Sequence, residues 1–174
     1  PRFLCTLFLE QRRIPEKRRI CSCCRYRRRT KGEVLMLSNL EQQKVQDCIE
    51  AAEAATSGEL RVHLEAKCKT DAVARAIDIF DQLDMQATAA RNGVLIYIAY
   101  ADRKLAIIGD EGINACVSHN FWDSTRDLML ANFKEGRLAE GLCAGITEAG
   151  LQLAQFFPPQ ANDQNELPNQ ISFG

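Results

Sequence analysis

The chain has 174 residues, of which 46% are hydrophobic and 26% are charged, an ordinary balance for one globular domain with a single core. No apolar run has the length that a membrane-spanning helix needs, and the eight cysteines do not form the compact framework of a small disulfide-rich secreted protein.

The net charge of −1 conceals a division of the chain. Residues 1–37 carry eleven Lys/Arg and three Asp/Glu, which gives +8, whereas residues 38–174 carry eleven and twenty, which gives −9. The acidic part argues against nonspecific nucleic-acid binding and suits a protein that binds cations.

Residues 1–37 form a basic head that we expect to be disordered or not native. The composition changes at Met36, which favours a native start there, with the head as an upstream extension. Two other interpretations stay open. One is an arm that binds nucleic acid or a membrane surface. The other is a zinc knuckle of Cys5, Cys21, Cys23 and Cys24, although their spacing does not give two ligand pairs.

The first predicted helix follows Ser38. Ser38 and Glu41 make the S-x-x-E capping box, and Leu40 opens the helix. Apolar residues then recur every three or four positions on one face, at Val45, Cys48, Ile49, Ala52 and Ala55. Gly58 is expected to end the helix.

Alternating apolar and polar residues over Glu59–Ala66 predict a strand with one wetter face, near a sheet edge. Thr70 or Asp71 is expected to cap a second helix, and the apolar run Val94–Tyr100 predicts a buried strand. A strand, a helix and a strand in succession imply a right-handed parallel crossover. The turn after Tyr100 then returns the chain as an antiparallel third strand, Leu105–Ile108.

Two further helices are expected before the end of the domain. Asn120 is expected to cap a helix that ends at Gly136, and another runs from about Leu138 to Phe157. Glycines lower the helix propensity of this last segment, so we expect close backbone packing around them; they are Gly141, Gly145 and Gly150.

These elements predict an α/β fold, with helices on both faces of a small mixed β-sheet (an αβα sandwich). A βαβ crossover precedes an antiparallel hairpin strand. The folded domain spans residues 38–158. Residues 159–174 form a polar tail that is expected to lie across the domain surface.

The first candidate site lies where the two parallel strands end. Cys68, Asp71, Asp102 and Arg103 follow these strands, so they gather at one edge of the sheet, where open α/β sheets bind ligands. Asp71 and Asp102 offer oxygen ligands, and Arg103 offers a charge for a phosphate oxygen. Asp71, Asp102 and Arg103 are therefore the candidate catalytic residues, and Asp102 is also a candidate metal ligand.

The second candidate site lies at the opposite edge, because the third strand runs back. Asp110 and Glu111 emerge there beside Glu59, Arg91 and Asn92, about 15–20 Å from the first edge. Asp110 and Glu111, with Glu59 as a third member, are candidate metal ligands. The alternative for each site is a plain structural one: a solvated hairpin turn at Asp102, and a loop that enters a short helix at Asp110.

Other reactive residue types favour structural roles. Neither His63 nor His119 supports an obvious Ser or Cys nucleophile. The four cysteines outside the head are expected to be reduced, buried small hydrophobes of an intracellular protein; they are Cys48, Cys68, Cys116 and Cys143.

Three segments together resemble the TPM domain family. They are SGELRVHLE, NGVLIYIAYADRKLAIIGDEGI and FWDSTRDLMLANFKEGRLAEGL, and the resemblance covers about Leu40 to Pro158. It is greatest for soluble bacterial members with a similar NEL…ISFG tail. One departure is Asp110, which stands where an aromatic residue is common in the family.

The resemblance implies a small αβα sandwich, bound calcium in some members and proposed acid-phosphatase activity in others. We expect a domain that binds a divalent cation, with calcium favoured and magnesium as the alternative, and a protein partner as a second ligand. The cysteines favour a cytoplasmic location, and a monomer is expected. A weak metal-dependent acid phosphatase that hydrolyses phosphate monoesters is the alternative.

Overall fold

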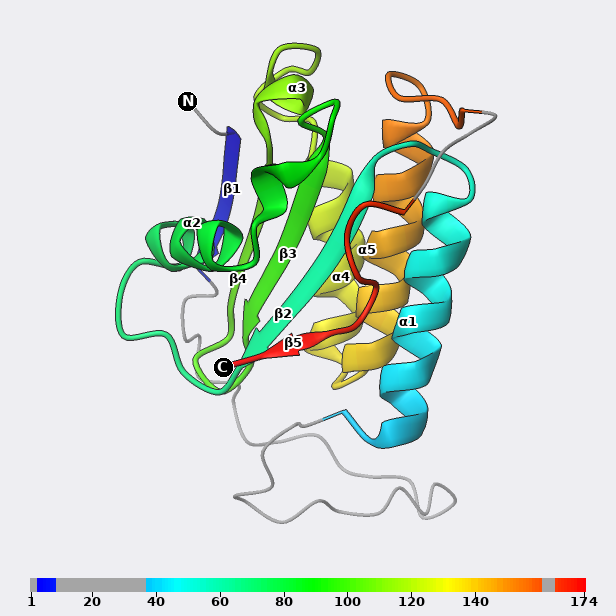
Figure 1. Cartoon of the computed structure of the whole chain (residues 1–174). Coiled ribbons are helices and arrows are strands. Elements are labelled where there is room, and N and C mark those ends of the chain that lie inside the picture. Colours follow the sequence, from blue (N-terminus) through cyan, green and yellow to red (C-terminus); the bar gives the residue numbers. More distant parts are fainter. Residues whose placement is uncertain (1–2, 9–36, 161–164) are drawn as a thin grey trace, which may run out of the picture.

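A mixed sheet forms the centre of the computed structural model, which describes residues 3–8, 37–160 and 165–174. Within these residues the strand order is β1-β4-β3-β2-β5 (Figure 1). The three middle strands are β2 (Glu59–Glu65), β3 (Gly93–Ala99) and β4 (Lys104–Gly109). β2 pairs with β3 in parallel and β3 pairs with β4 antiparallel, as the crossover and hairpin predict.

Two further strands flank these three. β1 (Phe3–Phe8) pairs antiparallel with β4, and β5 (Ser172–Phe173) pairs in parallel with β2. β1 belongs to the expected basic head, and only its backbone is described. Residues 1–2 and 9–36, which include the basic run and the three clustered cysteines, lie outside the described residues. β5 belongs to the tail, which therefore joins the sheet.

Helices cover both faces of the sheet, which confirms the predicted α/β sandwich (Figure 1). One face is covered by α1 (Asn39–Glu53), α4 (Asp123–Lys134) and α5 (Leu138–Leu153). α2 (Ala72–Gln82) packs on the other face. Two short elements complete the fold, η1 (Met85–Ala87) and α3 (Glu111–Asn114).

Local sequence signals fix the starts of α1 and α2. The capping box forms as predicted, since the backbone N–H of Ser38 donates to Glu41 Oε2 (2.8 Å) and the N–H of Glu41 donates to Ser38 Oγ (3.4 Å). Asp71, rather than Thr70, caps α2: its Oδ1 accepts the backbone N–H groups of Val73 and Ala74.

Three predicted helix boundaries are wrong. α1 ends at Glu53, with Ala54 at the C-cap position, rather than at Gly58. Asn120 does not cap a helix, because α4 begins at Asp123 with Trp122 at the N-cap position; Asn120 instead lies in a preceding turn, where its side chain accepts from Ser118 Oγ. α5 ends at Leu153 rather than at Phe157, and the last residues before Phe157 form turns.

The close packing expected around the glycines of α5 is confirmed. A Cβ atom on Gly141 would lie 2.4 Å from the ring of Phe133, and one on Gly145 would lie 2.4 Å from Met129. Both contacted residues belong to α4, so small residues let α4 and α5 approach closely.

The prediction of a wet face on β2 is wrong. Its polar residues are all buried, with exposed fractions of 8% or less; they are Glu59, Arg61, His63 and Glu65. The tail lies over this part of the sheet and supplies partners that the alternating pattern could not reveal. Leu167 and Ile171 are the buried apolar residues that hold the tail in place.

None of the helices in the described ranges has both the length and the apolar character that crossing a bilayer requires.

Candidate functional site

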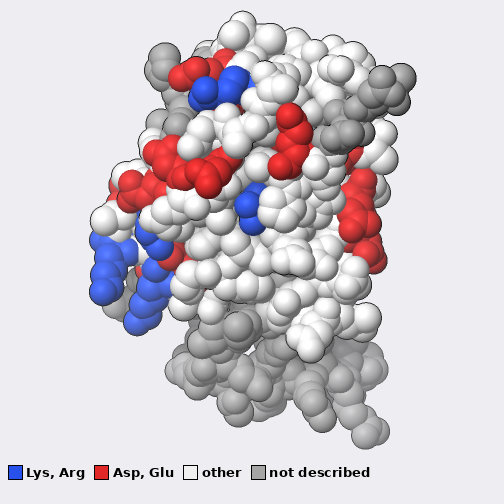
Figure 2. Space-filling model, in the orientation of Figure 1, with Lys and Arg blue, Asp and Glu red and all other residues white. Residues whose placement is uncertain are grey.

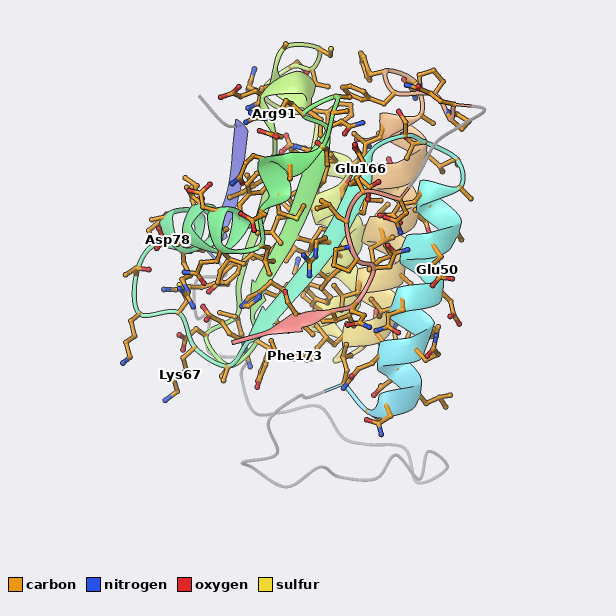
Figure 3. The ribbon with its side chains drawn as sticks, viewed as in Figure 1. Glu50, Lys67, Asp78, Arg91, Glu166 and Phe173 are labelled. Atoms are coloured by element: carbon orange, nitrogen blue, oxygen red, sulfur yellow. The ribbon has the colours of Figure 1, made fainter. Side chains whose placement is uncertain are left out.

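The first candidate site lies at the edge where β2 and β3 end. Two loops form it, residues 66–71 after β2 and residues 100–103 between β3 and β4; we call it the hairpin edge. Figure 3 labels Lys67 at this lower end of the sheet and Arg91 at the upper end, so the two candidate sites lie at opposite edges as predicted.

Hydrogen bonds join the two loops of the hairpin edge. The backbone N–H of Cys68 donates to Asp102 Oδ2 (2.8 Å). The ammonium group of Lys104 donates to the carbonyl oxygens of Cys68 (2.9 Å) and Thr70 (2.8 Å). Lys104 therefore occupies carbonyl oxygens of the loop after β2, one of which, that of Thr70, also accepts from the Cys68 thiol at 3.2 Å.

The carboxylates of the hairpin edge keep unused oxygen atoms. Asp71 and Asp102 are exposed. Asp71 uses Oδ1 to cap α2, and Asp102 uses Oδ2 to hold Cys68. Asp71 Oδ2 and Asp102 Oδ1 accept no hydrogen bond from any other described residue, so each can still bind a cation.

Positive charge also gathers at the hairpin edge. Lys67, Lys69 and Arg103 are exposed there. Figure 2 shows basic side chains at the lower left of this face, with acidic ones above them. Arg103 occupies the left-handed region, with φ of 54°, as a tight hairpin turn requires. This edge can thus attract anions through the basic groups and cations through the two carboxylates.

At the opposite edge the carboxylate of Asp110 is buried, and both of its oxygens accept hydrogen bonds within the protein. Its side chain has no exposed area, and it accepts from Arg91 Nε (2.7 Å), from Arg91 Nη2 (3.0 Å) and from the backbone N–H of Glu111 (2.8 Å). The last bond caps α3, so the structural interpretation of the Asp110 loop is confirmed. Glu111 remains mostly exposed, 3.7 Å from Arg91.

The third candidate ligand of this edge, Glu59, holds the tail. Its buried carboxylate accepts the backbone N–H groups of Glu166 (2.9 Å) and Leu167 (3.3 Å). Glu166 in turn accepts the backbone N–H of Ala89 (3.1 Å). Glu59 and Asp110 therefore serve two different contacts and do not join in one set of ligands.

In the part of the chain that the structure describes, no group of three or more His, Cys, Asp or Glu side chains is placed to hold a metal ion. A cation at either edge would therefore depend on two carboxylates at most, with water completing its coordination.

A buried polar cluster on β2 was missed by the sequence reasoning. Glu65 accepts from Arg75 Nε (3.2 Å) and Nη2 (3.0 Å), and the hydroxyl of Tyr97 also donates to it. Burial alone would raise the pKa of Glu65, but the Arg75 and Tyr97 hydrogen bonds outweigh it and hold the pKa below its ordinary value. The one available signal was Tyr97 inside an otherwise aliphatic strand, opposite His63.

His63 completes this cluster. Its Nδ1 lies 2.9 Å from Ser172 Oγ of the tail, and its ring stacks on Tyr97 at 6.0 Å between centroids. Burial lowers the pKa of His63, so the ring is neutral at pH 7. These contacts fasten β5 to β2, which gives the cluster a structural role.

Comparisons with known proteins agree with this fold. Residues 33–152 match the TPM domain family, and no curated protein matches the chain. The chain is similar to BA42 protein from the psychrophilic bacterium Bizionia argentinensis, with 47% identity over 80% of this chain and 96% of that one, and a TM-score of 0.77. The N-terminal domain of a protein from P. gingivalis shares the fold at 20% identity, with a TM-score of 0.57 over 72% of this chain and 81% of that one. The chain belongs to the TPM domain family.

Proposed function

We propose that this TPM domain binds a divalent cation at the hairpin edge, through Asp71 and Asp102. The observation that supports this is the pair of exposed carboxylates on loops tied together by the bond from Cys68 to Asp102, each with an oxygen free of hydrogen bonds to described residues. Calcium is favoured over magnesium, because calcium accepts irregular oxygen ligands whereas magnesium demands near-ideal octahedral geometry.

The expected affinity is low. Two carboxylates provide few protein ligands, and the charges of Lys67, Lys69 and Arg103 oppose a cation. We therefore expect a dissociation constant of about 0.1–1 mM, in the range of weak extracellular-type calcium modules.

The test is a calcium titration of the full chain, followed by amide chemical shifts. Asp71→Asn and Asp102→Asn keep the hydrogen-bond acceptors of the cap and the loop contact, so both variants should fold. Each is expected to weaken binding at least tenfold. Asp47→Asn is the matched control, because it makes the same substitution at an exposed residue of α1 that belongs to neither candidate site. This variant should leave the titration unchanged.

Two results would overturn this assignment. One is a set of shifts centred on Glu111 that Glu111→Gln abolishes, which would move the ion to the opposite edge. The other is an absence of shifts up to several millimolar calcium.

The second candidate function is hydrolysis of phosphate monoesters at the same edge. The exposed charges of Lys67, Lys69 and Arg103 beside two carboxylates favour it, because transferring a phosphoryl group requires neutralisation of its negative oxygens. In this mechanism Arg103 would bind a phosphate oxygen, and Asp102 would hold the cation, which would supply further neutralisation of the phosphate charge. Turnover of p-nitrophenyl phosphate with added calcium or magnesium tests it, with Arg103→Gln expected to reduce kcat/KM at least tenfold. Activity that is indifferent to both Arg103→Gln and Asp102→Asn would come from elsewhere.

A protein partner, a monomeric state and a cytoplasmic location complete the proposal. Light scattering after size exclusion tests the monomer, and fractionation of cells that express the tagged full chain tests the location.

A further inference from the structure

Two free cysteines face each other across the contact between α1 and α5. Cys48 belongs to α1 and Cys143 to α5. Figure 1 shows these helices side by side and running in the same direction, both upward in the view. Both thiols are partly exposed and pack at the margin of the main hydrophobic cluster.

Contacts on either side of the two cysteines fix the register of the helices. Lys44 forms an ion pair with Glu140 at 3.6 Å, toward the start of both helices. Toward their ends Gly150 touches Ala52 so closely that a Cβ on the glycine would lie 2.8 Å from the Cβ of Ala52. The cysteines lie between these two contacts, on the segments where the helices are held together.

Side-chain contacts also place the two thiols together. Cys143 Sγ donates to the carbonyl oxygen of Lys44 at 3.7 Å. Lys44 lies one helical turn before Cys48 in α1. Burial, and next the contact with the Cys48 thiol, raise the pKa of Cys143 to about 12.

We propose that Cys48 and Cys143 are a redox modification site, which a small-molecule disulfide of the glutathione type converts reversibly into a disulfide that links α1 to α5. The sequence analysis expects Cys48 and Cys143 to be reduced; under this proposal the reduced form and the disulfide form are the two states of the pair. Cys68 keeps the expected role, because it is buried and its thiol donates to the carbonyl oxygen of Thr70 at 3.2 Å.

The reaction is a double thiol–disulfide exchange. The thiolate of Cys48 attacks one sulfur of the oxidant, whose S–S bond breaks and releases one thiolate. Cys143 then gives its proton to solvent and attacks the Cys48 sulfur of this mixed disulfide, which releases the second small thiol. Two protein thiols are oxidised and one small disulfide is reduced to two thiols. The second step is intramolecular, because the helix contact already places Cys143 beside the Cys48 sulfur that it attacks.

Peptide mapping of the full chain tests the proposal directly. The folded protein is incubated with reduced and oxidised glutathione in defined ratios, free thiols are blocked with an alkylating agent, and trypsin is added without reductant. Cleavage after Lys44, Arg61 and Arg137 yields peptides 45–61 and 138–174, each with one cysteine. The expected result is a linked pair of these two peptides that accumulates as the oxidised fraction rises and disappears on reduction.

Internal controls separate this pair from general thiol oxidation. Cys116 is exposed and should give only a mixed disulfide with glutathione. Cys48→Ser and Cys143→Ser should each abolish the linked peptide, whereas Cys116→Ser should leave its yield unchanged. The inference is overturned if the folded wild-type protein carries glutathione on both cysteines, or keeps both reduced, without the link. It is also overturned if the link forms only when urea is present.

Discussion

Gly150 offers a direct test of how closely α1 and α5 pack. In an isolated helix, alanine is more favourable than glycine by about 1 kcal/mol. Here the new Cβ of Gly150→Ala would lie 2.8 Å from the Cβ of Ala52, 3.2 Å from its Cα and 3.3 Å from its carbonyl oxygen. Carbon atoms in contact normally lie about 3.5–4.0 Å apart, so the helices would have to separate by roughly 0.7–1.2 Å.

The expected result is a destabilised protein. Two of the three contacted atoms are backbone atoms, which no rotamer change can move, and the neighbours Ile49 and Leu153 are fully buried. Overpacking of this kind costs about 2–3 kcal/mol, and the gain in helix propensity returns about 1 kcal/mol. We therefore expect the free energy of unfolding to fall by about 1–2 kcal/mol and Tm by about 2–8 °C.

Urea and thermal unfolding of the reduced full chain, followed by circular dichroism, measure this change. The matched control is the double variant Ala52→Gly/Gly150→Ala, which removes the opposing Cβ. Its stability should exceed the sum of the two single effects by about 1 kcal/mol. A Gly150→Ala protein as stable as the wild type, or additive effects in the double variant, would show that the two helices are not in the close contact described.

Three further predictions concern buried polar groups. Burial raises the pKa of Glu53 to about 7, so the folded protein holds this proton more tightly than the unfolded chain, and the stabilisation is lost as pH rises through about 7. Glu53→Gln should therefore be more stable than the wild type by about 1–2 kcal/mol at pH 8 and equal at pH 4.5, measured by urea unfolding; equal stability at both pH values would contradict this. Glu59→Gln weakens the charge-assisted bonds to the tail amides, whose hydrogen exchange should accelerate about fivefold while core amides stay unchanged. Tyr97→Phe removes a donor that holds the pKa of Glu65 low, so stability at pH 7 should fall by about 1–2 kcal/mol, with a smaller difference near pH 4; a difference independent of pH would contradict it.

Local patterns were sufficient to predict most of the elements. The capping box at Ser38, the cap at Asp71 and the hairpin after Tyr100 each depend on residues within a few positions of one another, so a single sequence reveals them. The order of strand, helix and strand then predicts the parallel crossover, because that connection has one hand.

Contacts between distant residues explain what the sequence did not reveal. The polar face of β2 was wrongly predicted to be wet because two of its residues have partners in the tail, more than 100 positions later: Ser172 for His63, and the amides of Glu166 and Leu167 for Glu59. Glu65, on the same face, pairs instead with Arg75 and Tyr97. A tail that buries polar side chains of one strand leaves no periodic signal in its own sequence.

At the candidate sites the sequence predicted which residues lie near one another, but not which hydrogen bonds they make. The predicted topology correctly brought Arg91 near Asp110, but no pattern indicated that the carboxylate would be fully buried and would accept from two of the three guanidinium nitrogens. At the hairpin edge the pattern placed Asp71 and Asp102 on neighbouring loops, but it did not indicate that Lys104 would donate to the carbonyl oxygens of Cys68 and Thr70.

Burial separates structural carboxylates from those that can still bind a ligand. A carboxylate inside the protein must be paired, because an unpaired buried charge is too unfavourable; Asp110 and Glu65 each meet this demand with an arginine. Asp71 and Asp102 face water at the hairpin edge, where solvent satisfies the oxygens that the loops leave unused. Exchanging water for a cation there requires no protein bond to break. The same exchange at Asp110 would require the loss of two hydrogen bonds from Arg91 and the cap of α3. The basic charges of Lys67, Lys69 and Arg103 at the hairpin edge oppose a cation, so the lower cost in broken bonds is what favours the hairpin edge over the edge at Asp110.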